Sequence, residues 1–407
     1  MSKEEKRAPE VRFEGFHDDW KQRKLGDIAD ITKLAGFEFT KYVNYSDEGT
    51  IIALRGLNVK NGQLILDDVK YIDQSDFKKL SRSKLYKNDI LFTYVGTVGE
   101  LAVIPEDDKY YLAPNVARIR LVNGVCPQFI SQMMSGSIFY KKVIFPLIAT
   151  SSQPALSMEN VRKFTFLLPI LEEQIKISTF LNQLDDSIAL HQEKLSKLQS
   201  LKKAALQSLF PQKNETEPKV RFANFTDRWS SYKIKDIFLE RVEKNGEGEL
   251  ISVTINSGVV KASELDRKDN SSSNKTNYKR IKRHDIVYNS MRMWQGASGY
   301  SPYNGIVSPA YTVITPKPGI NSKFFSFMFK KNEMIQNFKR NSQGLTSDTW
   351  NLKFPALSSI KVKVPKTEEQ DKIEQYMTNL DSIIKLYQIK LENLQGIKKA
   401  LLQKMFI

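Results

Sequence analysis

The sequence predicts an α+β protein with an internal pseudo-twofold repeat, in which two globular bodies are separated by two long helices that form an antiparallel coiled coil. Three observations support this fold class. A short motif occurs twice, at residues 11–28 and 220–237, and a long helical segment occurs twice, at residues 172–210 and 368–406. Short strand-like runs, turns and helical stretches fill the segments between the copies.

The short motif, which we call the lead motif, opens each half of the chain. Nine of its 18 positions are identical in the two copies, including Trp20 and its equivalent Trp229. Each half-unit therefore consists of a lead motif, a globular body and a long helix, in that order.

The two long segments align without a gap, and 20 of 39 positions are identical. In both copies the seam positions recur in steps of four and three residues, as a coiled coil requires. They are Ile177, Leu181, Leu184, Ile188, His191, Leu195, Leu198, Lys202, Ala205 and Leu209, then Ile373, Met377, Leu380, Ile384, Tyr387, Leu391, Leu394, Lys398, Leu401 and Met405. A helix of this length spans roughly 60 Å. A body follows the first helix and precedes the second, which favours antiparallel pairing; packing of each helix on its own body is the alternative.

These repeats divide the chain into six parts. They are an N-terminal arm with the lead motif (1–20), a first body (21–165), a central spacer helix (166–210), a linker with the second lead motif (211–229), a second body (230–360) and a C-terminal spacer helix (361–407).

Both bodies mix short strands with turns and a helical stretch. The strand candidates are Ile51–Leu54, Asp89–Tyr94, Leu101–Ile104, Arg118–Leu121, Asp285–Tyr288 and Tyr311–Ile314. The segments Pro127–Ile144 and Ser322–Phe338 are predicted to be helices.

Charge separates the bodies from the helices. The chain has 62 Lys and Arg against 46 Asp and Glu, a net charge of +16. The first helix has five residues of each sign and the second has six of each, so the whole excess lies outside them. This distribution favours bodies that bind nucleic acid and helices that act as a neutral spacer. A basic protein that is merely soluble is the alternative.

Polar loops at matching positions in the two bodies carry residue types that can bind base edges and phosphates. The expected DNA contacts are Arg55, Asn58, Lys60, Thr93, Tyr94, Thr97, Ser151, Ser152 and Gln153 in the first body, and Asn289, Arg292, Trp294, Gln295, Ser342, Gln343 and Thr346 in the second. A single loop of this kind is more often a plain turn, and Tyr94 and Trp294 also suit a core. The recurrence in both bodies supports the assignment.

The sequence contains no catalytic motif that we recognise, and we expect no catalytic residue and no metal site. The best match to a methyltransferase motif, Ser308 to Tyr311, lacks the second proline and suits the start of a strand. There is no Pro-Asp dipeptide and no Walker phosphate loop. The three histidines are far apart, and the single cysteine, Cys126, excludes disulfides. Without a signal peptide or a long apolar run, a cytoplasmic protein is expected.

The long helices carry the most specific resemblance to a known family. The run Leu168–Gln174 opens a helix that carries Leu184-Asp185 and closes on Lys202-Lys203-Ala204, and the copy that begins with Val364–Gln370 follows the same plan. This strongly resembles the repeated spacer region of type I restriction–modification specificity subunits. The stretch Met291–Ala297 adds to the match, which extends from about Phe13 to the C-terminus.

The resemblance implies that each body is a target-recognition domain that reads one half of a split, asymmetric site in double-stranded DNA. It implies that the helices fix the gap and dock two modification subunits, which bind S-adenosylmethionine and methylate adenine. Restriction subunits, which use ATP and Mg, would join this core, and this chain would bind no cofactor. The resemblance places partner contacts on Glu173, Gln174, Asp185, Glu369, Gln370 and Asp381.

Two alternatives differ in class from this reading. The chain could be a self-contained DNA methyltransferase or nuclease with an unrecognised active site, which cofactor binding by the isolated chain would indicate. It could also be a coiled-coil scaffold that binds only proteins, which specific, salt-sensitive binding to a bipartite DNA site would exclude.

Overall fold

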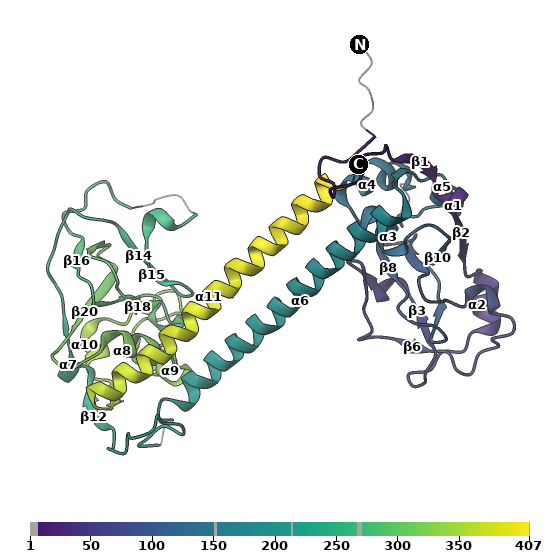
Figure 1. Ribbon diagram of the computed structural model, residues 1–407. Helices are drawn as coiled ribbons and strands as arrows, with labels where there is room; N and C mark the ends of the chain where they lie inside the picture. Colours follow the sequence, from purple (N-terminus) through teal and green to yellow (C-terminus); the bar gives the residue numbers. More distant parts are fainter. Residues whose placement is uncertain (1–6, 150–152, 213–214, 267–270, 407) are drawn as a thin grey trace, which may run out of the picture. The chain divides into compact units, whose positions relative to one another are not determined.

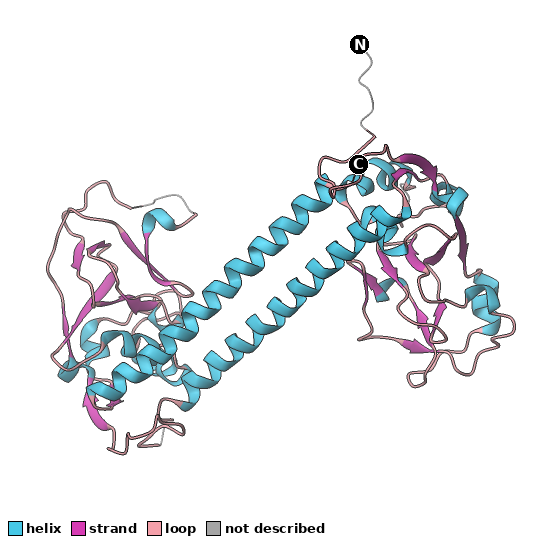
Figure 2. Cartoon of the chain, in the orientation of Figure 1, coloured by secondary structure: helices cyan, strands magenta, loops and turns pink. Residues whose placement is uncertain are grey.

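The computed structural model describes residues 7–149, 153–212, 215–266 and 271–406, which form two compact units. Unit 1 contains the residues up to His191 and those from Lys390 onward, and unit 2 contains Gln192–Ile389. Each body mixes short strands with short helices (Figure 2). Two 38-residue helices, α6 (Leu171–Ser208) and α11 (Thr367–Lys404), run through both units (Figure 1).

A four-stranded antiparallel sheet with the same strand order forms the framework of each unit. In unit 1 the order is β2 (Ala29–Lys33), β10 (Val116–Leu121), β7 (Ile90–Thr93) and β8 (Leu101–Val103). In unit 2 it is β13 (Phe238–Glu240), β20 (Tyr311–Pro316), β17 (Ile286–Asn289) and β18 (Ser298–Tyr300). All six predicted strands are confirmed, with ends that shift by at most two residues.

The lead motif of each half pairs with the strand that precedes the long helix. β1 (Lys21–Lys24) is antiparallel to β11 (Thr165–Leu168), and β12 (Ser230–Lys233) is antiparallel to β21 (Lys361–Val364). A one-turn helix follows in each copy, α1 (Leu25–Ile28) and α7 (Ile234–Ile237). The two ends of each body are thereby joined at the start of its helix.

The remaining strands show where the two bodies diverge. In unit 1, β3 (Ile52–Leu54) is parallel to β9 (Tyr110–Leu112) and antiparallel to β6 (Lys70–Tyr71), and β4 (Val59–Lys60) pairs with β5 (Gln63–Leu64). In unit 2, β14 (Ile251–Thr254) pairs with β15 (Gly258–Lys261), and β16 (Lys279–Ile281) pairs with β19 (Gly305–Val307). A parallel bridge between Leu250 and Ile306 repeats the β3–β9 pairing, so β14 and β3 occupy equivalent places.

The two predicted body helices are each broken. Residues 127–144 form α3 (Pro127–Met134), α4 (Ser137–Phe139) and a π-helical turn, because the Ser135 hydroxyl and the Gly136 amide bond back into the last turn of α3. Residues 322–338 form α8 (Ser322–Met328) and the start of α9 (Asn332–Asn341). There Lys330 and Lys331 direct their ammonium groups to the backbone carbonyls of Gly296 and Pro211, contacts that the sequence does not reveal.

The long helices pair in antiparallel fashion within each unit. In unit 2, Lys202 of α6 forms an ion pair with Asp381 of α11, and Lys194 lies over the ring of Tyr387. In unit 1, Lys398 forms the equivalent ion pair with Asp185. Every predicted seam position is buried or partly buried, which confirms the seam.

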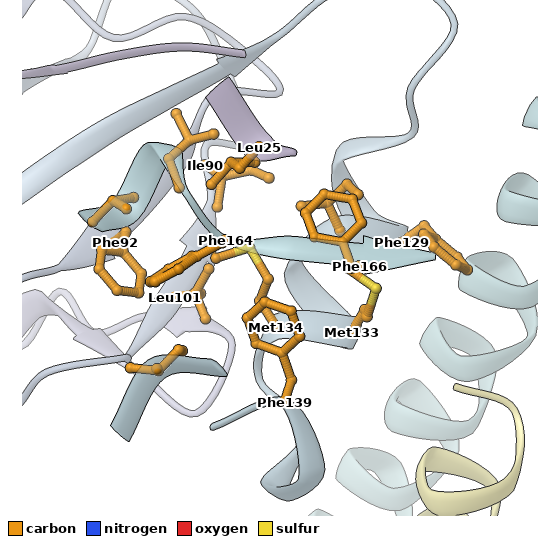
Figure 3. Close-up of a cluster of buried hydrophobic side chains, with 14 of the residues drawn as sticks. Leu25, Ile90, Phe92, Leu101, Phe129, Met133, Met134, Phe139, Phe164 and Phe166 are labelled. Carbon is orange, nitrogen blue, oxygen red and sulfur yellow. The ribbon is translucent and has the colours of Figure 1, made fainter. Parts of the chain in front are cut away.

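Each long helix begins in one unit and ends in the core of the other. Phe210, just after α6, packs against Phe324 in unit 2 at 5.2 Å between ring centroids, and Phe406, after α11, packs against Phe129 in unit 1 at 5.3 Å. The lead-motif tryptophans Trp20 and Trp229 contact the same two phenylalanines. Figure 3 shows part of the unit 1 core, in which buried aromatic and methionine side chains pack together.

The N-terminus of each long helix is fixed to its body by a repeated set of buried polar contacts. Arg12 donates two hydrogen bonds to the carboxylate of Glu173, at 2.9 and 2.8 Å, and Arg221 donates two to Glu369, at 2.9 and 2.7 Å. Both glutamates are almost fully buried.

The neighbouring glutamines bond to the backbone of the body. Gln174 accepts a hydrogen bond from the Cys126 amide at 2.9 Å, and Gln370 accepts one from the Asn321 amide at 2.9 Å. Glu173, Gln174, Glu369 and Gln370 are thus buried and used within this chain, which corrects the expectation that these four side chains contact a partner.

Replacing Arg221 with methionine should destabilise unit 2 by about 3 kcal/mol, because the carboxylate of Glu369 would stay buried without its partner. Urea unfolding measures this loss. Arg228→Met, an exposed arginine of the same lead motif, serves as the control. The double variant Arg221→Met/Glu369→Met should recover part of the stability, and equal losses for the Arg221 and Arg228 variants would contradict the assigned role.

Candidate nucleic-acid interface

The polar loops predicted in the first body meet around one hollow. It has a volume of about 530 Å³ and is lined by Arg55, Gly56 and Leu57 after β3, by residues 93 and 95–97 at the end of β7, and by Gln153. The backbone holds two of these loops together, since the Leu156 amide donates to the Tyr94 carbonyl at 2.8 Å.

Three predicted contact residues of the first body have buried side chains that support the loops from within, including Thr93, which borders the hollow but is 0% exposed. Asn58 is fully buried, and its amide group donates to the carbonyls of Ile65 and Asp68 at 2.9 and 2.8 Å. The Thr93 hydroxyl is buried and donates to the Thr97 carbonyl. Tyr94 is 9% exposed, and burial raises the pKa of its phenol. The prediction that Asn58, Thr93 and Tyr94 contact DNA is therefore corrected.

The other predicted residues of the first body lie at the surface. Arg55 lines the hollow and donates to the carboxylate of Asp68 at 2.8 Å, which orients its guanidinium. Thr97 and Gln153 are exposed at the hollow, and Lys60 is exposed on β4 outside its lining. Ser151 and Ser152 lie outside the described residues.

The sequence did not identify four further residues that line this hollow, which are Phe39, Tyr45, Pro114 and Asn115. Phe39, from α2 (Gly36–Tyr42), and Tyr45 form an aromatic pair with ring centroids 5.5 Å apart. Asn115 is exposed with a φ of 71°, at the turn before β10. A Pro-Asn pair before a strand was the one local signal available for this turn.

In the second body the structure brings together the two predicted loops, 289–296 and 342–346. The Leu352 amide donates to the Ser290 carbonyl at 2.8 Å, the equivalent of the bond from Leu156 to Tyr94 in unit 1. Trp294 packs edge-on against Trp350, with ring centroids 5.1 Å apart.

The predicted residues of these two loops differ in exposure. Arg292, Gln343 and Thr346 are exposed, whereas Trp294 and Gln295 are half-buried. The Ser342 hydroxyl donates to the Phe338 carbonyl at 2.8 Å at the end of α9, and its contact with DNA stays a prediction.

A second hollow, of about 880 Å³, lies at the equivalent place in unit 2. Asn289 at the end of β17 and the turn Pro309–Ala310 before β20 line it, as Thr93 and Pro114–Asn115 line the first hollow. Of the residues that line this hollow, only Asn289 is among the predicted DNA contacts. The lining also includes the amides of Asn274 and Asn277, the ammonium group of Lys275 and the ring of Tyr278.

The sequence missed these residues because no strand or turn pattern marks them as part of a site. The segment Ser308–Tyr311 is a turn in which the Tyr311 amide bonds to the Ser308 carbonyl, and β20 starts at Tyr311, which confirms that it opens a strand.

Each sheet carries one buried aspartate at the start of the strand that leads to the loops. Asp89 accepts two hydrogen bonds from Arg120, both at 2.7 Å, and one from the Tyr86 amide. Asp285 accepts two from Arg241, at 2.8 and 3.0 Å, and one from the Lys282 amide. These carboxylates raise the pKa of both arginines, and the contacts give both aspartates a structural role.

Two properties of the described residues bear on other classes of function. Among them, no group of three or more His, Cys, Asp or Glu side chains is placed to hold a metal ion. None of the helices in the described ranges is both long and apolar enough to cross a membrane.

The family model for the type I restriction modification DNA specificity domain matches residues 17–200 and 226–395. The chain belongs to this family. The two matches cover most of the sequence and fall on the two half-units, each with its lead motif, body and long helix.

Curated relatives match over part of their length. The chain is 26% identical to the type I restriction enzyme EcoBI specificity subunit of Escherichia coli over 171 residues, which is 41% of this chain and 35% of that protein. It is 27% identical to the EcoKI specificity subunit of Escherichia coli strain K12 over 138 residues, 32% of this chain and 29% of that protein. The matched segments thus span about a third of these relatives.

Solved structures confirm the fold class. The chain superposes on the S subunit of a type I restriction-modification system from M. genitalium with a TM-score of 0.60 at 15% identity, covering 98% of this chain and 99% of that one. A chain from a structure of complex assembly and conformational transition of the type I R-M system gives a TM-score of 0.51 at 14% identity, with 95% and 97% covered.

Lys330 holds the end of the 289–296 loop and should give unit 2 a distinct pH dependence. Its ammonium group donates to the carbonyls of Gly296 and Ile255 at 2.6 and 3.0 Å, and burial, with a contribution from Lys202, lowers its pKa to about 8. Since the unfolded chain binds this proton up to a higher pH, the free energy of unfolding should rise as pH increases above about 8.

Lys330→Met should lack this rise, and the difference between wild type and variant, measured by urea unfolding from pH 7 to 10, isolates it. Lys317→Met, whose ammonium group also donates to a carbonyl but at an exposed site, is the control. Parallel pH profiles for wild type and Lys330→Met would contradict this role.

Proposed function

We propose that this chain is the DNA-specificity subunit of a type I restriction–modification complex, in which each body reads one half of a bipartite, asymmetric DNA site. The observation that carries the proposal is the repeated framework. Both bodies present loops at the ends of β7 and β17 beside equivalent hollows, but the residues that line them differ. Two domains that read different half-sites need loops at equivalent positions whose side chains differ in their hydrogen-bonding groups.

Charge supports DNA as the partner of the bodies. The net charge of +16 lies outside the long helices, and Arg55, Lys60, Arg292 and Lys275 lie at or beside the hollows or their loops. Contacts to phosphates supply most of the affinity of such surfaces and make it fall with salt. A scaffold that binds only proteins would not need this distribution.

The long helices would serve as the spacer and as the docking site for two modification subunits. Apolar residues are exposed at equivalent positions of both helices: Leu190 and Leu386 are 62% and 66% exposed, and Leu201 and Ile397 are 46% and 50% exposed. Each unit contains one member of each pair. A surface that occurs twice in one chain suits a partner that binds twice.

Asp185 and Asp381, the two predicted partner contacts that stay partly exposed, lie in these same units and pair with Lys398 and Lys202. Their role in binding a partner stays a prediction. In the proposed assembly, S-adenosylmethionine is bound by the modification subunits, ATP and Mg by the restriction subunits that join them, and no cofactor by this chain. The chain supplies recognition and scaffold, and we assign it no catalytic residue.

Exchanging residues 21–165 for the first body of another specificity subunit should change one half of the methylated site and leave the other half intact. Sequencing that maps methylated adenines genome-wide, in cells that carry this chain and its modification partner, gives the result. Replacing residues 230–360 is the matched exchange and should change only the other half. A change in both halves after either exchange would contradict two independent readers, and methyl transfer by the isolated chain would indicate an enzyme.

Duplicating one heptad in each helix, residues 192–198 and 387–393, should lengthen the spacer by roughly 10 Å and widen the gap by about three base pairs. The seam period stays intact because seven residues are added to both helices. The same methylation map measures the gap. Duplicating the heptad in one helix only should disrupt assembly, and a changed half-site with an unchanged gap would contradict the spacer role.

A further inference from the structure

Leu345 is the most exposed large apolar side chain among the described residues. Its relative exposure is 102%, compared with 69% for Val242, the next highest. It lies at the tip of the loop between α9 and α10 (Phe354–Ser358), the loop for which the sequence predicts DNA contact at Gln343 and Thr346. Single exposed apolar side chains are common on protein surfaces, but Leu345 is fully exposed and lies within a loop predicted to meet DNA.

The loop that carries Leu345 is ordered by its own hydrogen bonds. Gln343 and Asn351 exchange backbone hydrogen bonds at 3.0 and 2.8 Å, and the Thr349 amide and hydroxyl both donate to the Thr346 carbonyl. Gly344 adopts a φ of +149°, and a Cβ there would lie 2.6 Å from the Thr349 carbonyl oxygen. The turn therefore requires glycine, and the backbone that carries Leu345 is ordered.

Positive charge surrounds the base of this loop. Lys339 lies over the ring of Trp350 at 5.3 Å, and Trp350 packs on Trp294 of the Arg292 loop. Arg340 and Lys353, which flank the loop in sequence, are exposed, and Asp348 is the one acidic residue within it. An apolar tip on a basic, aromatic base suits nucleic acid, which offers phosphates to the basic side chains and stacked bases to the tip.

We propose that Leu345 inserts as a wedge between neighbouring base pairs of the half-site read by the second body. This inference rests on the proposed function and adds a residue that determines specificity. An inserted apolar side chain partly unstacks two neighbouring base pairs, and pyrimidine–purine steps are the most easily unstacked. Leu345 would therefore select for a flexible step without a hydrogen bond to a base edge, while Gln343 and Thr346 beside it remain available to polar groups of the DNA.

The test uses the full chain assembled with the modification subunits of its own system and a duplex that contains the mapped bipartite site. 2-Aminopurine replaces each adenine of the second half-site in turn, because its fluorescence rises when the base is unstacked. With the wild-type chain we expect a rise on binding at one step other than the target adenine, which the modification subunit itself would flip out of the stack. Leu345→Ala should abolish the rise and weaken binding about tenfold or more. Leu239→Ala, at another exposed leucine of unit 2, should change neither.

Three outcomes would overturn the wedge. They are unchanged fluorescence and affinity in Leu345→Ala, the absence of a rise at every position other than the target adenine with the wild type, or weaker binding of Leu345→Ala with the rise intact. The last result would mean that Leu345 contacts the duplex in a groove. Failure of the proposed function looks different, because the wild-type assembly would then show no specific, salt-sensitive binding to the duplex at all.

Discussion

The buried glutamate at the first turn of each long helix, bound by two hydrogen bonds to an arginine of the lead motif, is the constraint on which the rest of the fold depends. Glu173 and Glu369 are almost fully buried, so their charge is tolerated only with Arg12 and Arg221 in place. The adjacent glutamines bond to the body. The sequence Glu-Glu-Gln at the start of each long helix thereby fixes the direction in which the helix leaves its body. Because this sequence occurs identically in both halves, the two halves share one pseudo-twofold design.

The ends of the helices couple the two units. Met405 and Phe406 complete the core of unit 1, and Leu209 and Phe210 complete the core of unit 2. Neither core is complete without residues from the far end of a helix that begins in the other unit. A chain built in this way can keep its helices and cores nearly constant while the loops beside the sheets change, and this is the pattern of its internal repeat: identical positions concentrate in the helices and lead motifs, not in the bodies.

The sequence predicted those features that depend on local periodicity and repetition. The two long helices, their seam and the six strands follow from periodicity and repetition alone, whereas the two body helices were predicted without their breaks. The orientation of loop side chains does not. An asparagine such as Asn58 has the same groups whether it binds a base or the backbone of its own loop, and only the fold shows that Ile65 and Asp68 use them. The sequence also gives no sign that Tyr278 and Asn274, in the segment before β16, line the second hollow, since no strand or turn pattern marks them.

The central claim is that two separate readers act through one scaffold, and the affinity of the assembled complex for altered sites tests it most directly. The duplex would carry the intact site, a site with either half scrambled, or one with both halves scrambled, at a fixed salt concentration. If two separate domains read the site, scrambling either half should weaken binding, and the two losses in binding free energy should add. Full affinity after one half is scrambled would contradict the account.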